Sequence, residues 1–208
     1  MDNSLKEIVF WGIFVSIALL LLYGQMLVST PAVEVTKPSQ ISEYLPDISK
    51  TEKDAVLFYE NNTFEKLKEI PKRKFVYGLG EYSGPAFSEN SVKDGAFQTS
   101  LQSIIDTLEI KKEDLKKAVV EKGFSELAAY VNDIFQVIYQ YLSNDSSLVI
   151  IYKIWKKSSG PVLTYYYLTL FDDEYALTII ELYASEQMEK FEEKGLNFKE
   201  LWKTIFNK

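Results

Sequence analysis

The feature that most constrains this chain is an uninterrupted apolar run near its N-terminus. Residues Ile8–Val28 carry no charged side chain. At about 1.5 Å rise per residue, a helix of this length spans about 30 Å, the thickness of a bilayer core. A helix that is apolar on every side favours a lipid environment. The run therefore predicts a transmembrane helix over residues 8–28, preceded by a short N-terminal tail over residues 1–7.

A cleaved signal peptide is the main alternative, and a helix buried in a soluble core is a third. Signal peptides combine a basic region with an apolar stretch of about 7–15 residues. Here Lys6 is offset by Asp2 and Glu7, and the apolar stretch is longer. Lysines on the two sides nearly balance, so charge does not fix the orientation. A short tail before an apolar run is typical of a signal-anchor, so we expect a single-pass membrane protein with an extracytoplasmic domain.

The chain after the anchor divides into a linker and one globular domain. Residues 29–48 carry Pro31, Pro38 and Pro46 among Ser, Thr and Glu, without sustained periodicity, as is typical of a linker. The remaining residues, 49–208, are long enough for one domain. With 14 Tyr, 13 Phe and 3 Trp in the chain, a packed core is expected.

Two missing residue types exclude several classes of function. The chain contains no Cys and no His. Disulfides, thiol nucleophiles, Ser-His-Asp triads and His-based metal sites are therefore excluded. The formal net charge of −7 argues against a nucleic-acid partner, since phosphate binding needs clustered Lys and Arg. We expect a protein that is not an enzyme and that holds no cofactor or metal, and we do not expect a small-molecule ligand.

Two short motifs resemble ligand sites but have simpler interpretations. Gly78-Leu79-Gly80 follows a strand, as in a dinucleotide-binding fingerprint, but the third glycine of that fingerprint is missing. A turn or close backbone contact is the expected role. Asp172-Asp173-Glu174 offers oxygen ligands for Ca²⁺ or Mg²⁺ without the other residues of a known loop. An acidic helix start is the expected role.

Periodicity predicts an α+β domain, with a small antiparallel or mixed sheet packed against helices. Helices are predicted in these segments: Thr51–Tyr59, Thr63–Ile70, Asn90–Leu108, Lys112–Glu121, Ser125–Leu142, Asp173 to Gly195, and from Asn197 onward. Strands are predicted over Lys74–Leu79, Leu148–Trp155 and Val162–Phe171, the last two as an antiparallel hairpin, with loops over Tyr82–Ser88 and Lys156–Pro161. A strand over Tyr175–Leu182 is the alternative to the helix there.

The strand and the helix that follows it resemble a known family. The segment from Lys74 to Tyr82, KFVYGLGEY, is similar to the strand and Gly-x-Gly opening of Lpp-twenty type bacterial lipoproteins and of the amino-terminal domain of flagellar assembly protein T. Ala96 and Ser100 partly reproduce the family's line of small residues. The resemblance covers residues 64–194 and implies a non-catalytic envelope or appendage-assembly component. The family's lipidated Cys is absent here.

The candidate binding residues are aromatic and lie on the predicted hairpin. Alternation places Tyr166 on one sheet face and both Tyr165 and Tyr167 on the other. Tyr152 and Trp155 lie on the neighbouring strand. Because Tyr and Trp are frequent at interface hot spots, we expect one of these faces to be exposed and to contact another protein.

The expected function is therefore that of a non-enzymatic, membrane-anchored structural or accessory subunit of a cell-envelope or membrane-associated assembly. Other protein subunits are the expected partners. The alternative is a membrane-anchored ligand-binding or sensor domain that uses the Tyr-rich sheet face.

The first prediction concerns the anchor. We expect the full-length protein to resist carbonate extraction from membranes, because an apolar helix of bilayer length does not leave lipid when surface charges are disrupted. N-terminal sequencing should find a chain that still begins near Met1. A mature chain beginning near Val33 would show instead that the segment is a cleaved signal.

Overall fold

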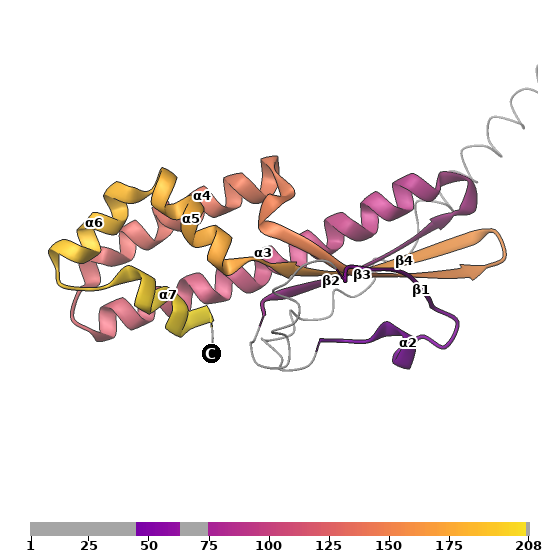
Figure 1. The fold of residues 1–208 in the computed structure, drawn as a ribbon, viewed down its shortest axis with the longest axis horizontal. Coiled ribbons are helices and arrows are strands. Elements are labelled where there is room, and N and C mark those ends of the chain that lie inside the picture. Colours follow the sequence, from indigo (N-terminus) through magenta and orange to yellow (C-terminus); the bar gives the residue numbers. More distant parts are fainter. Residues whose placement is uncertain (1–44, 63–74, 207–208) are drawn as a thin grey trace, which may run out of the picture. The chain divides into compact units, whose positions relative to one another are not determined.

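A computed structural model describes residues 45–62 and 75–206 (Figure 1). They belong to one compact unit, Pro38–Lys208. Within these described stretches, no helix is long and apolar enough to cross a membrane. The predicted anchor over residues 8–28 lies outside them, as do the tail over residues 1–7, most of the linker over residues 29–48, and the predicted helix Thr63–Ile70.

The domain is α+β, as predicted, and its sheet is antiparallel throughout. The four strands are β1 (Val56–Glu60), β2 (Tyr77–Pro85), β3 (Val149–Ser159) and β4 (Val162–Phe171). They lie in the order β1-β3-β4-β2, and each neighbouring pair is antiparallel. The two C-terminal strands therefore form the centre of the sheet, and the two N-terminal strands form its edges.

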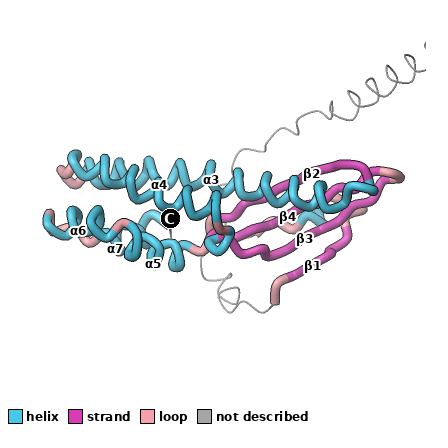
Figure 2. Tube along the Cα trace, turned by 90° about the horizontal axis from the view of Figure 1, so that it is seen from above, coloured by secondary structure: helices cyan, strands magenta, loops and turns pink. Residues whose placement is uncertain are grey.

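Six α-helices are described: α2 (Ile48–Thr51), α3 (Glu89–Glu121), α4 (Ala128–Asn144), α5 (Asp173–Tyr183), α6 (Ser185–Glu193) and α7 (Phe198–Phe206). Short 3₁₀ turns occur at Ala86–Ser88, Ser125–Leu127 and Ser146–Leu148. Figure 2 shows α3 lying along one face of the sheet and continuing beside α4 among the other helices. The long helix is thus shared by the sheet region and the helical region.

The predicted hairpin is confirmed and is longer than expected. β3 and β4 pair from Val149 opposite Phe171 to Ser159 opposite Val162. The predicted loop, Lys156–Pro161, is wrong for its first four residues, because their backbone continues the ladder. The turn closes at Gly160, whose φ of +58° favours glycine.

The helix predicted over Thr51–Tyr59 is wrong. A short helix, α2, ends at Thr51, and the chain forms the edge strand β1 from Val56 onward. The apolar spacing suggested a helix, but the β-branched and aromatic residues of this segment suit a strand. Pairing with β3 favours the strand over the helix in this segment. A salt bridge of 2.8 Å between Lys153 and Glu60 also stabilises this pairing.

Two further boundaries are wrong. The predicted loop Tyr82–Ser88 continues β2 as far as Pro85, because β4 offers a pairing partner along its whole length. The predicted break before Lys112 does not occur, and α3 is continuous. Salt bridges one helical turn apart run across and beyond the expected break, Lys112 with Glu109 and Lys116 with Glu113. The predicted stop at Gly123, with φ of +89°, is confirmed.

The C-terminal helical periodicity is confirmed, with one interruption. The segment expected as a single helix is divided at Ala184 into α5 and α6. The alternative strand over Tyr175–Leu182 is wrong. Asn197 begins the last helix as predicted, with its Oδ1 accepting from the Glu200 amide at 3.1 Å. These helices bury an aromatic group in which Trp202 and Phe206 stack at 4.0 Å between ring centroids, and Trp202 Nε1 donates to the Asp173 carbonyl at 3.1 Å.

Two glycines let α3 approach the sheet backbone to backbone. A Cβ built on Gly78 would lie 2.0 Å from the Ser100 carbonyl oxygen. A Cβ on Gly80 would lie 2.0 Å from the Ala96 carbonyl oxygen and 2.3 Å from the Ser100 amide nitrogen. Ala96 and Ser100 are themselves buried. Small residues on both elements therefore set the distance between the helix and the sheet.

The second prediction tests this contact. We expect Gly80→Ala to lower the free energy of unfolding by about 3 kcal/mol or more, because the added methyl meets backbone atoms that cannot rotate away. Gly123→Ala is the matched control. A Cβ added at Gly123 meets no other atom, so the substitution lowers the free energy of unfolding only through the positive φ, by about 1 kcal/mol. Denaturant titration measures both values, and equal losses in the two variants would contradict the proposed role of the contact.

Candidate functional site

The predicted exposed tyrosine face does not exist. Alternation places the three tyrosines as expected, with Tyr165 and Tyr167 toward α3 and Tyr166 on the opposite face. However, all three are buried, with exposed fractions of 0%, 7% and 4% in that order. Trp155 is 1% exposed, and Tyr152 is half-buried against the same cluster as Trp155. The prediction that one set forms an open patch is therefore wrong.

Both faces of the hairpin are covered by segments distant in sequence. On the α3 side, Val92 and Ala96 pack against Tyr165 and Tyr167. On the other side, the cluster around Tyr166 includes Ile48, Ala55, Phe75 and Tyr77. Residues that precede the hairpin by about 70 to 100 positions thus cover this face of the sheet. The sequence of the hairpin alone does not predict that they do so.

A cluster of charged and polar side chains is centred on Glu89, at the start of α3. Its carboxylate accepts a hydrogen bond from the Tyr165 hydroxyl. The same Oε1 atom lies 3.1 Å from Lys156 Nζ and 3.2 Å from Lys93 Nζ. The Lys93 ammonium also lies 5.1 Å from the Phe58 ring centroid. We call Glu89, Tyr165, Lys93 and Lys156 the Glu89 cluster.

The Glu89 cluster shifts the acidity of its members. The hydrogen bond from Tyr165, followed by those from Lys156 and Lys93, lowers the pKa of Glu89 to about 2. Burial and the same hydrogen bond to Glu89 raise the pKa of Tyr165 to about 12. At neutral pH the carboxylate is therefore charged and the phenol is protonated. Such a pair holds the helix to the sheet and supplies no proton donor or acceptor of near-neutral pKa for catalysis.

The opposite face holds a second Tyr–Glu pair. Burial, the largest effect, raises the pKa of Glu81, and the hydrogen bond with Tyr166 partly opposes it. Burial and the nearby Glu81 charge also raise the pKa of Tyr166. Glu81 and Tyr166 are directly opposite in the β2–β4 ladder, which explains the contact. This pair, too, belongs to the structure of the sheet.

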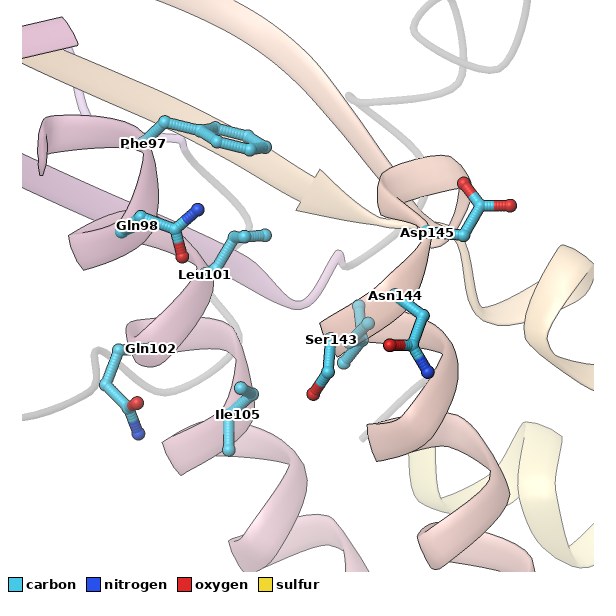
Figure 3. A pocket seen from close by; sticks show the side chains of 9 residues that line it. Phe97, Gln98, Leu101, Gln102, Ile105, Ser143, Asn144 and Asp145 are labelled. Carbon is cyan, nitrogen blue, oxygen red and sulfur yellow. The ribbon is translucent and has the colours of Figure 1, made fainter. Parts of the chain in front are cut away.

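A groove of about 430 Å³ lies between α3 and the C-terminal end of α4 (Figure 3). Its lining combines apolar with amide, hydroxyl and carboxylate side chains: Phe97, Gln98, Leu101, Gln102, Ile105, Leu142, Ser143, Asn144 and Asp145. Local bonds already engage several of the polar groups. Gln102 Nε2 donates to Asp106 at 2.8 Å, and Ser143 Oγ donates to the Tyr139 carbonyl at 2.8 Å.

The lining of this groove carries a single acidic side chain and no basic one. Its one acidic side chain, Asp145, accepts from the Ser147 amide at 2.9 Å, as in a turn. The groove offers no Lys or Arg for a phosphate and no second carboxylate for acid–base work. Across residues 45–62 and 75–206, no group of three or more acidic side chains is placed to hold a metal ion.

The two short motifs have the simpler roles that the sequence analysis favoured. Asp172 caps α5, with its Oδ1 accepting from the Tyr175 amide at 3.0 Å, so the acidic tripeptide is a helix start. Gly78 and Gly80 serve the close contact with α3.

The edge strand β1 carries four consecutive exposed apolar residues. Val56, Leu57, Phe58 and Tyr59 are 70%, 45%, 53% and 44% exposed, respectively. We call these four consecutive residues the edge surface. The strand pairs only with β3 among the described strands, and its register shifts between Leu57 and Tyr59. An exposed apolar edge of this kind is typical of a site where another chain adds a strand.

Comparison of this chain with protein-family models, with curated proteins and with solved structures finds no match. The resemblance to Lpp-twenty type lipoproteins and to flagellar assembly protein T therefore stays a prediction.

The third prediction concerns acid stability. The pKa of Glu89 falls from an ordinary value of 4.5 to about 2 on folding. Its contribution to stability is therefore complete above about pH 4.5 and is lost as the pH falls toward 2. We expect Glu89→Gln to flatten the dependence of stability on pH between these values. Urea unfolding at pH 2.5, 3.5 and 5 measures it.

Glu121→Gln is the matched control, since it removes one carboxylate from the far end of the same helix. That variant should keep the pH dependence of the parent protein. An acid limb that is unchanged in Glu89→Gln would show that the cluster does not stabilise the fold.

Proposed function

We propose that this protein is a non-enzymatic, membrane-anchored structural or accessory subunit of a cell-envelope or membrane-associated assembly. Its partner is another protein, which it contacts through the edge surface on β1. The globular domain lies on the extracytoplasmic side of the membrane.

The sequence supports a membrane anchor and a non-enzymatic role. Ile8–Val28 is long and apolar enough to span a bilayer. The chain has neither Cys nor His, and Glu89 and Tyr165, whose pKa values are strongly shifted, hydrogen-bond to each other, with Lys156 and Lys93 beside the Glu89 carboxylate. These pairs join elements of the fold to one another, as structural ion pairs do.

The edge surface is the observation that carries the proposal. A soluble domain normally protects an edge strand with charge, proline or a covering segment. Here the only charged residue of β1 is Glu60, which Lys153 neutralises at 2.8 Å. The other four side chains are exposed and apolar. A subunit that pairs this edge with a partner strand gains backbone hydrogen bonds and buries these side chains in a single step.

The alternative function, a ligand-binding or sensor domain with a Tyr-rich face, has less support. Tyr165, Tyr166 and Tyr167 are buried. A ligand could reach them only by displacing α3 or the cluster around Ile48. We therefore propose that the partner binds at the edge strand β1 and not at the tyrosines in the centre of the sheet.

The fourth prediction tests the edge surface. We expect the double variant Val56→Lys and Tyr59→Lys to reduce association with the partner at least about 5-fold, equivalent to about 1 kcal/mol, because edge lysines oppose strand addition. Both side chains are exposed, so the fold should be retained. Cross-linking in native membranes, followed by quantification of the adduct, measures the association.

Val120→Lys is the matched control, because Val120 is 50% exposed near the C-terminal end of α3. This variant should form the adduct as the parent protein does. Equal adduct in the double variant and the control would contradict the role of β1. A chain that carbonate extracts from the membrane would contradict the anchor instead.

A further inference from the structure

Two uncharged segments meet at one end of the sheet. The β3–β4 turn and the start of α3 lie at this same end (Figures 1 and 2). Two segments meet there, Gly84–Ser88 and Ser158–Val162, and neither contains a charged residue. They are joined by the pairing of Pro85 with Val162 and by a hydrogen bond of 2.8 Å from the Ala86 amide to the Pro161 carbonyl. We call these two segments the tip.

The tip presents a large aromatic side chain to solvent. Phe87 is 88% exposed, the highest value among the large hydrophobic residues of the described stretches. Val162, which pairs with Pro85, is 40% exposed. Phe87 sits in a 3₁₀ turn between β2 and α3, so its backbone is fixed by regular structure on both sides. An exposed ring held in this way loses little conformational freedom when it is buried by a partner.

Charged groups lie next to the tip. Lys93 and Lys156 contact Glu89, and Lys157 contacts Glu52 at 2.9 Å. Asp54 also lines a shallow pocket that includes Ser158. Three lysines and three acids thus lie close to the uncharged segments of the tip. Lysine stems that extend past apolar surface, with aromatic rings nearby, are typical of groups at a membrane–water interface.

We propose that the tip docks on the lipid bilayer that holds the anchor, with Phe87 inserted among the lipid headgroups and upper acyl chains. The inference rests on the proposed function, since it requires Ile8–Val28 to span that bilayer. A single protruding ring between two turns offers far less area than a stable protein interface buries. It suits a soft, continuous apolar phase, which needs no complementary shape.

The length of chain before the described domain supports this occupant. Residues 29–44, which separate the expected anchor from Leu45, are 16 in number. Fully extended, they reach at most about 55 Å. The domain is therefore confined near the bilayer at an effective concentration in the mM range. Under this constraint, a contact too weak to recruit a free protein keeps the tip at the lipid surface.

The test uses the full-length protein in phosphatidylcholine vesicles, with and without brominated acyl chains. Phe87→Trp places a fluorescent ring at the tip and should retain the fold, because the position is exposed. We expect bromine to reduce the emission added by this residue about two-fold, since an interfacial side chain lies about 5–10 Å deep. The parent protein contains the same three other tryptophans, Trp11, Trp155 and Trp202. Its emission in the same vesicles is therefore measured and subtracted.

Val120→Trp is the matched control, about 45 Å along α3 from the tip at 1.5 Å per residue. Its added emission should not change with brominated lipid. Equal quenching of the two variants, or no quenching of either while the protein floats with the vesicles, would overturn docking and leave the anchor intact. Failure to float would overturn the anchor as well. Shielding of the tip tryptophan only after membrane proteins are added would identify a protein partner and overturn the lipid proposal.

Discussion

The rest of this structure depends on the contact between two glycines of β2 and the backbone of α3. Because Gly78 and Gly80 have no Cβ, the Ala96 and Ser100 backbone can lie directly against the sheet. This close approach sets the plane in which α3 covers Tyr165 and Tyr167, and it places Glu89 within reach of Tyr165 and Lys156. From the same contact, α3 continues into the helical region and gives α4 and α7 a surface to pack on. Any larger residue at these positions would force α3 and β2 apart at this contact.

The sequence was most informative where local pattern and tertiary context agree. The β3–β4 hairpin and α7 have strong periodicity and clear turn or capping residues, and both were predicted. β1 was predicted as a helix because its apolar spacing is compatible with either state, and only the partner strand β3, about a hundred residues later, decides between them. The break expected before Lys112 rested on a dense charge pattern. Those charges instead form pairs along one continuous helix.

The candidate site shows the same limit. Alternation correctly assigned Tyr166 to one face and its neighbours to the other, since that depends only on strand geometry. Burial could not be assigned, because the covering residues Ile48 and Phe75 come from segments whose position the hairpin does not encode. Exposure of the edge surface was missed because β1 was not recognised as a strand. A run of β-branched and aromatic residues in VLFYE was the available signal.

The continuity of α3 has a mechanical consequence. The helix has no Gly or Pro from Ala96 to Glu121, and its 33 residues extend about 50 Å. A helix without such residues resists bending. Since its first half is fixed to the sheet and its second half to the helical region, a tilt imposed at one end is transmitted as a displacement of the other. A load on the sheet would therefore reach the helices packed on the second half of α3 through the helix itself.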